Sequence, residues 1–304
     1  MPRLFALLAL ALASTVSAAG PAVMVERDIV YATADGEKVR LDLAKPTTPG
    51  PHPCVVCLHG GAWKFGDKKD LSRVGRNPDA IGTTEVVVTK HASLIEMLAN
   101  QGYVAVSVGY RLAPKAKFPA QIEDAKTAVR FLRANAKQYD LDPDRIAALG
   151  FSAGGHLAAL LGTTDKTVGF DGPLYPDQSS AVQCVVDFFG PTDLTLYTEA
   201  EGIEKAYLAP FLGTRYSTKP DVYKKASPLE HVSKAAPPFL ILHGTADVIV
   251  PIIHSERLQK KLLDCGGTCE LRTVPGEGHG WTGPVMLDTM TTVSKFLAAN
   301  LKAK

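Results

Sequence analysis

The chain has 304 residues, of which 46% are hydrophobic and 21% are charged, and its formal net charge is +2 at pH 7. These values are typical of a folded globular protein and exclude a disordered or highly charged one. The near-neutral balance gives no indication of a nucleic-acid partner or of an acidic membrane partner. A chain of this length can bury one large core, and α/β proteins often use it for a single domain.

Residues 1–19 are typical of a secretory signal peptide. Arg3 supplies a positive start, residues 4–13 are an apolar run, and Val16-Ser17-Ala18 offers small residues before the expected cleavage site. The alternative is an uncleaved anchor, but the run is shorter than the ~20 residues that a bilayer span needs. We therefore expect an exported protein, periplasmic or extracellular, with no membrane span and a mature domain over residues 20–304.

Strands and helices are predicted to alternate along this domain. Two extended segments meet at Asp35-Gly36, a hairpin signal, and apolar runs then alternate with stretches of helical spacing. A turn is expected over residues 140–144. The expected strands are 24–33, 38–44, 53–58, 102–108, 145–149, 182–189, 239–242 and 269–274, and the expected helices are 92–100, 122–136, 155–161, 251–263 and 285–301. This order predicts an α/β fold with a mostly parallel eight-stranded sheet and helices on both faces.

Two segments do not fit that alternation. Residues 64–90 contain three glycines and a proline, which favours an irregular loop. Residues 192–236 are interpreted as a small lid-like insertion. Its aromatic residues either line an acyl or aryl pocket or form a satellite core under a long loop; they are Tyr197, Tyr207, Phe211, Tyr216 and Tyr223.

Gly150-Phe151-Ser152-Ala153-Gly154 is a G-x-S-x-G motif between a predicted strand and a predicted helix. In that context the serine lies on a sharp turn that exposes its hydroxyl, and small neighbours allow close backbone approach. The alternative is a tight strand-to-helix turn whose serine only caps the helix. The motif makes Ser152 the candidate nucleophile.

His59-Gly60-Gly61-Ala62-Trp63 directly follows another predicted strand. Acyl transfer develops negative charge on the carbonyl oxygen, and backbone N–H groups at a glycine-rich bend can stabilise that charge. We assign donation to Gly61 and Ala62, with Gly60 forming the turn, and to the amide of Ala153. The alternative is a glycine turn that only ends the strand.

A serine nucleophile needs a base, and the base needs a carboxylate that orients it. His279 is the candidate base because it lies in a glycine-rich loop after the last predicted strand. Asp247, after the preceding strand, is favoured as the acid over Asp193. His59 and His243 are interpreted as structural hydrogen-bonding residues and His156 as pointing away from the hydroxyl, whereas His52, His91, His231 and His254 are expected on the surface or in loops.

The five cysteines fall into two groups. Cys54, Cys57 and Cys184 lie in apolar runs and are expected to be buried free thiols. Cys265 and Cys269 bracket a flexible connection and are candidates for a small disulfide, which the sequence alone does not decide. No histidine pair accompanies the cysteines at metal-ligand spacing, so we expect no zinc site.

Several motifs in this order resemble those of α/β-hydrolases of the hormone-sensitive-lipase-like group, in particular the exported bacterial acetylesterase and feruloyl-esterase-like (BD-FAE-like) carboxylesterases. They are the two motifs at 59–63 and 150–155, Gly109-Tyr110-Arg111-Leu112-Ala113-Pro114, Phe118-Pro119-Ala120, Ser227-Pro228, His243-Gly244-Thr245-Ala246-Asp247 with Val250-Pro251, and Gly278-His279-Gly280. Two features depart from the family pattern: Ala62 replaces the usual third glycine, and the 64–90 segment is longer than usual.

The resemblance implies a secreted serine carboxylesterase with Ser152 as nucleophile, Asp247 and His279 as its partners, and no metal or organic cofactor. The expected substrate is a small or polysaccharide-linked ester with a short acyl or aryl group. Trp63 and Trp281 adjoin the motifs, so they either wall the substrate pocket or pack behind it. The alternatives are a formamidase-type amidase, a serine peptidase and a binding protein. The signal segment argues against the first, the 59–61 turn against the second, and the complete triad against the third.

Overall fold

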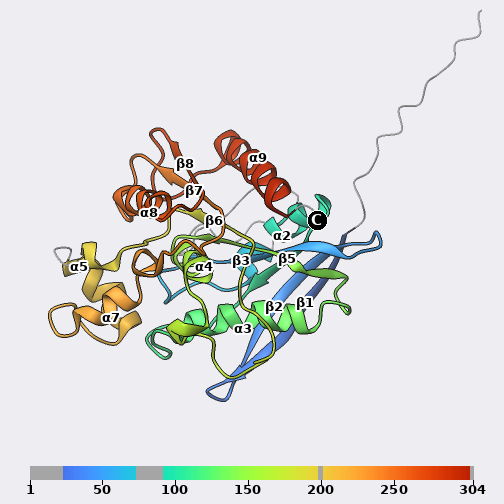
Figure 1. The fold of residues 1–304 in the computed structure, drawn as a ribbon, viewed down its shortest axis with the longest axis horizontal. Helices are drawn as coiled ribbons and strands as arrows, with labels where there is room; N and C mark the ends of the chain where they lie inside the picture. The colour runs from blue at the N-terminus through green and yellow to red at the C-terminus, as the bar shows by residue number, and fades with distance from the viewer. Residues whose placement is uncertain (1–22, 73–91, 198–200, 302–304) are drawn as a thin grey trace, which may run out of the picture.

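A computed structural model describes residues 23–72, 92–197 and 201–301 of the chain (Figure 1). Within these residues, eight strands form a single sheet in the order β1-β2-β4-β3-β5-β6-β7-β8. The strands are β1 (Val23–Ala34), β2 (Glu37–Pro46), β3 (His52–Leu58), β4 (Val104–Val108), β5 (Leu141–Phe151), β6 (Cys184–Phe188), β7 (Phe239–Gly244) and β8 (Cys269–Val274). The predicted α/β fold with an eight-stranded sheet is therefore confirmed.

The sheet is antiparallel at one edge and parallel elsewhere. β1 pairs with β2, and β2 with β4, in antiparallel register. All pairs from β4 through β3 and β5 to β8 are parallel. The central strands β4, β6 and β7 are buried along their whole length, which explains why each is apolar except for one residue, because a strand covered on both faces has no polar side.

Helices cover both faces of the sheet, as predicted (Figure 1). One apolar layer packs α3, α4 and α8 against the sheet, and the other packs α1, α2 and α9 against it. The described α-helices are α1 (Lys69–Ser72), α2 (Leu94–Asn100), α3 (Ala120–Ala134), α4 (Ala153–Thr163), α5 (Glu201–Ile203), α6 (Ala209–Leu212), α7 (Pro220–Lys225), α8 (Ile253–Asp264) and α9 (Gly283–Asn300). Shorter helical turns lie at Lys166–Val168, Leu194–Tyr197, Glu204–Leu208 and Pro228–His231.

Element ends differ from the predictions where side-chain contacts decide them. α2 begins at Leu94 rather than near Ala92, because Ser93 and Glu96 form a reciprocal capping box at its start. The turn expected over residues 140–144 is wrong in part: β5 already begins at Leu141. Leu141 pairs with His52 on β3, ahead of the main ladder that starts at Ile146.

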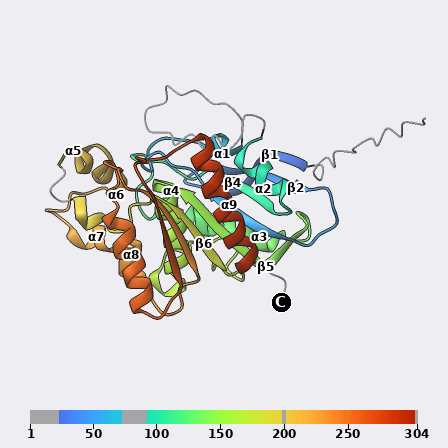
Figure 2. The ribbon, with the colours of Figure 1, turned by 90° about the horizontal axis from the view of Figure 1, so that it is seen from above.

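The insertion over residues 192–236 packs into the protein rather than lying apart from it. Figure 2 shows α5, α6 and α7 gathered at one end of the molecule, next to α8. Glu204, which is buried, accepts hydrogen bonds from the Tyr216 amide (2.6 Å) and the Tyr223 hydroxyl (2.8 Å), and these fix the internal shape of the insertion. Its buried aromatics Tyr197, Phe211 and Tyr223 belong to the same apolar layer as α3 and α4. These three aromatic residues therefore extend the main core.

The segment predicted as an irregular loop is described only over residues 64–72, and the rest of it lies outside the described residues. In the described part, the Lys68 ammonium lies 2.8 Å from carboxylate oxygens of both Asp28 and Asp42. The Lys68 carbonyl also accepts a 2.6 Å hydrogen bond from Ser107 Oγ on β4. The start of the segment is thus fixed to the antiparallel edge of the sheet.

Candidate active site

The parallel strands deliver the predicted site residues to one edge of the sheet. Ser152 directly follows β5, Asp247 follows β7, and His279 follows β8. The carboxyl ends of parallel strands meet at a common edge, where open α/β sheets hold their ligands. The glycine turn at residues 60–62 follows β3 at this same edge.

Ser152 occupies a strained turn between β5 and α4. Its φ of 53° and ψ of −118° lie outside the regions that a residue with a side chain favours. The turn is held by a 2.8 Å hydrogen bond from the Ser152 amide to the Phe188 carbonyl on β6. A Cβ added to Gly150 would lie 2.1 Å from the Gly154 carbonyl oxygen, and one added to Gly154 equally close to that of Leu58. Both glycines of the motif are therefore required by close backbone approach.

Ser152, His279 and Asp247 form a continuous chain of hydrogen bonds. His279 Nε2 lies 2.8 Å from Ser152 Oγ, and His279 Nδ1 lies 2.7 Å from Asp247 Oδ2. A carboxylate can only accept, so Nδ1 carries the proton and Nε2 is left to accept from the serine hydroxyl. The His279 side chain is 12% exposed, so a ligand can reach this part of the site. There, His279 can accept the proton of the Ser152 hydroxyl.

Asp247 is held in its ionised form. Its side chain is buried, and burial alone would raise its pKa. Hydrogen bonds from His243 and His279 and from the Val250 amide outweigh that effect and hold the pKa of Asp247 well below its ordinary value. The carboxylate is consequently charged at any pH at which the histidine is a useful base.

The glycine turn has an unusual backbone that leaves amides free. Gly61, Ala62 and Trp63 all have positive φ, at 107°, 50° and 57°. The amides of Lys64 and Phe65 donate to the Gly61 carbonyl and close the turn. Among the described residues, the amides of Gly61, Ala62 and Ala153 donate to no protein acceptor. The family that the sequence resembles usually has glycine at position 62. Ala62 adopts the left-handed conformation although it carries a side chain.

Trp63 and Trp281 are both buried, at 3% and 4% exposure. Trp63 stacks on Phe211 of the insertion with ring centroids 4.2 Å apart, and its Nε1 donates to His156 Nδ1 at 3.1 Å. Trp281 Nε1 donates to Thr289 Oγ1 at 3.0 Å. Both indoles are thus held by hydrogen bonds within the protein interior in this structure.

The remaining candidates lie elsewhere. Asp193, the alternative acid, pairs with Arg257 at 2.7 Å and has no contact with His279. The expectation that His254 lies on the surface or in a loop is wrong, because α8 carries it into the interior, where it is 1% exposed. His243 is a buried hydrogen-bonding residue as expected, but no sequence pattern indicated that it contacts Asp247.

Cys54, Cys57 and Cys184 are buried free thiols, as predicted. Cys265 and Cys269 are also free, so the candidate disulfide is not formed in this structure. Across the described ranges, no group of three or more histidine, cysteine or acidic residues is placed to hold a metal ion. Nor does any helix in these ranges have the length and apolar character to cross a membrane.

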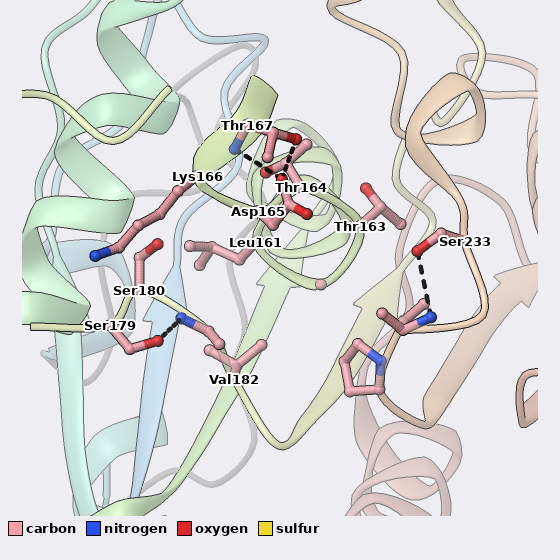
Figure 3. A pocket seen from close by; sticks show the side chains of 15 residues that line it. Leu161, Thr163, Thr164, Asp165, Lys166, Thr167, Ser179, Ser180, Val182 and Ser233 are labelled. Carbon is pink, nitrogen blue, oxygen red and sulfur yellow. Dashed lines mark hydrogen bonds between the residues drawn. The ribbon is translucent and has the colours of Figure 1, made fainter. Parts of the chain in front are cut away.

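A cavity of about 380 Å³ opens at the opposite end of α4 from Ser152 (Figure 3). Its wall includes Thr163 to Thr167 and Ser233, and its hydroxyl groups already have protein partners. Ser179 Oγ accepts from the Ala181 amide, and Ser233 Oγ accepts from the Ala235 amide, at 3.1 and 3.2 Å. This cavity is thus separate from the hydrogen-bonded residues Ser152, His279 and Asp247.

Comparison with known proteins agrees with the fold. The family model BD-FAE matches residues 41–262. Esterase LipC of Mycobacterium tuberculosis is 30% identical over 264 residues, which are 84% of this chain and 59% of LipC. The chain therefore spans little more than half the length of that relative.

Two solved structures extend the likeness over the fold. A truncated form of a carbohydrate esterase from gut microbiota has a TM-score of 0.74 and 28% identity, covering 92% of this chain and 97% of that one. A thermophilic esterase from Thermogutta terrifontis with propionate bound has a TM-score of 0.70 and 26% identity, covering 94% and 97%. The chain belongs to the BD-FAE family and has the α/β-hydrolase fold that its sequence motifs predict.

Proposed function

We propose that the protein is a serine carboxylesterase. The observation that carries the proposal is the chain of hydrogen bonds from Ser152 Oγ through His279 to Asp247, at 2.8 and 2.7 Å, with the serine on a strained turn. A hydroxyl bonded to a neutral imidazole, which is itself bonded to a carboxylate, is the arrangement that activates serine for acyl transfer. The esterases among the related proteins support the same activity.

In the first half of the reaction, Ser152 Oγ attacks the ester carbonyl carbon while its proton passes to His279 Nε2. The charge that develops on the carbonyl oxygen is stabilised by the free amides of Gly61, Ala62 and Ala153, each worth about 2.7–4 kcal/mol of barrier in comparable sites. Asp247 stabilises the imidazolium. The tetrahedral intermediate then expels the alkoxide, which takes the proton from His279 and leaves an acyl-serine.

In the second half, water takes the place of the alcohol. His279 accepts a proton from the water as it attacks the acyl-serine, and the second tetrahedral intermediate expels Ser152, which recovers its proton. The carboxylic acid leaves, and the enzyme returns to its starting protonation state. Every proton transfer uses groups of this chain, so the cycle needs no cofactor.

For the substrate we propose esters with a short acyl group, including acetyl or aryl groups on a polysaccharide. The support is the likeness to a carbohydrate esterase and to an esterase with bound propionate. Export would place the enzyme where such polymers occur, and the signal-like residues 1–19, which lie outside the described residues, are the basis for proposing it.

A series of p-nitrophenyl esters from acetate to decanoate, assayed with the mature chain and with Ser152→Ala, tests the activity. We expect turnover that is highest for the shortest chains and is lost in the variant. Acetylated and feruloylated xylan test the polymeric substrate. If the wild type hydrolyses N-formyl amides or peptides but no ester, the carboxylesterase proposal fails and an amidase or peptidase replaces it.

A further inference from the structure

Asp247 is in contact with a second imidazole that the proposed reaction does not use. His243 lies near the end of β7 with its side chain fully buried. Its Nε2 is 2.7 Å from the Val250 carbonyl oxygen and 3.3 Å from Asp247 Oδ2, and its Nδ1 is 2.6 Å from Ser255 Oγ on α8. Asp247 Oδ2 therefore faces two histidines, His279 on the ligand side and His243 on the interior side.

The partners of His243 decide where its proton lies. A backbone carbonyl can only accept, so Nε2 must carry a hydrogen, and that hydrogen points toward Val250 and Asp247 together. In the neutral ring, Nδ1 then accepts from the Ser255 hydroxyl. The Val250 carbonyl thus sets the tautomer that directs a donor at the carboxylate, and the bond from Ser255 to Nδ1 holds the ring in place, as second partners do for metal-bound histidines.

The same contacts close the loop that carries the acid. Asp247 Oδ1 accepts hydrogen bonds from the amides of Ile249 and Val250, both at 2.9 Å, and His243 binds the Val250 carbonyl. Val250 is consequently held on both sides, by the acid and by the second histidine. His243 fixes the position of the loop and, through its N–H, the orientation of Oδ2.

We infer that His243 is a positioning residue for the proposed reaction, which it serves by aiming Asp247 Oδ2 at His279 Nδ1. The inference rests on the proposed function and adds a fourth side chain, with Ser255 behind it, to the hydrogen-bonded chain. A purely structural histidine at this place would affect folding alone. A positioning histidine also sets the rate of the chemical step, because a small misplacement of an oriented group costs turnover.

His243→Leu fills the same space but donates no hydrogen, and His243→Gln can return an N–H close to the position of Nε2. We expect kcat for p-nitrophenyl acetate to fall about 10- to 100-fold in the leucine variant, with KM unchanged, and to recover largely in the glutamine variant. The matched control is His254→Leu. His254 is similarly buried and its ring accepts one hydrogen bond, from the Asp193 amide at 3.2 Å, but does not bond to Asp247.

The outcomes separate this inference from the proposed function. A wild type that hydrolyses no ester overturns both. An active wild type with unchanged kcat in folded His243→Leu, or with equal losses in His243→Leu and His254→Leu, overturns the positioning role alone. If His243→Leu does not fold, Ser255→Ala carries the test: losing the hydroxyl that holds the ring at Nδ1 should lower kcat about three- to tenfold, the effect of one ordinary hydrogen bond. Unchanged kcat in Ser255→Ala would then refute the inference.

Discussion

Replacing Trp63 by phenylalanine should slow the proposed reaction without touching any of its reacting groups. Trp63 ends the glycine turn, where it and Ala62 both hold a left-handed backbone that costs about 1–2 kcal/mol per residue. The contacts that offset this cost are the stack on Phe211 and the hydrogen bond from Nε1 to His156 Nδ1. His156 is itself fixed, because its Nε2 donates to the Ala226 carbonyl at 2.7 Å.

Phenylalanine keeps the stack but removes the N–H donor. The buried His156 Nδ1 then has no partner, which costs about 1–3 kcal/mol of folding free energy. With one of its two restraints gone, the turn aims its amides less well at the developing oxyanion. Since each such donor is worth about 2.7–4 kcal/mol of barrier, partial misalignment should lower kcat about 10- to 100-fold. KM should change little, because Trp63 is buried and not available to a substrate.

Urea unfolding and steady-state kinetics on p-nitrophenyl acetate measure the two effects separately. Tyr223→Phe is the matched control, because it also removes a buried donor, the hydroxyl that bonds to Glu204 at 2.8 Å and to the Thr214 carbonyl at 3.1 Å within the insertion. The control should lose stability and keep kcat. If Trp63→Phe loses the expected stability but keeps kcat, the turn does not depend on Trp63 and this reasoning is refuted.

Two further substitutions test the interior around the site. Burial raises the pKa of Asp187 from 3.8 to about 6, although it accepts a 2.9 Å hydrogen bond from the Gly190 amide. The folded state therefore holds the proton of the Asp187 carboxyl more tightly than the unfolded state does. The stability that the protonated carboxyl contributes is present below pH ~4 and is lost as the pH rises through about 6. Urea titrations should show wild type losing up to about 3 kcal/mol relative to Asp187→Asn between pH 4 and 7, and parallel curves would contradict the assignment. Gly154→Ala should abolish ester hydrolysis and lower the unfolding free energy by about 1–3 kcal/mol, because the added Cβ meets the Leu58 carbonyl. The control Gly202→Ala, with open space around the added Cβ, should change neither the activity nor the unfolding free energy. An active Gly154→Ala variant would show that the turn can relax.

Sequence patterns predicted the strands of the sheet well, because a strand is recognised from residues that are neighbours in the sequence. β8 is found over residues 269–274, as predicted, and the Asp35-Gly36 hairpin joins β1 to β2. Each predicted site residue also directly follows a strand or lies in the loop after one, which places it at the carboxyl edge once the sheet is known to be parallel. The order of the motifs along the chain was enough to predict that Ser152, Asp247 and His279 lie together.

Contacts between distant segments were not predictable in the same way. The burial of Trp63 depends on Phe211, which lies in an insertion with no regular pattern, and the ring of His254 contacts Asp193 and Tyr197 of the same insertion. The bond between His243 and Asp247 depends on the shape of the loop between them, which no periodicity encodes. Residues of this kind gain their roles only from tertiary structure.

The sheet order has a consequence for how the protein acquires its proposed activity. Among the described strands, β8 lies at the edge of the sheet and pairs with β7 alone, and the loop after it carries His279, 127 residues after Ser152. Contacts between such distant segments form slowly, since the intervening chain must first be ordered. A refolding chain would therefore complete most of its core before gaining a base for its serine. Ester hydrolysis would then reappear with the docking of the final strand, later than the bulk of the secondary structure.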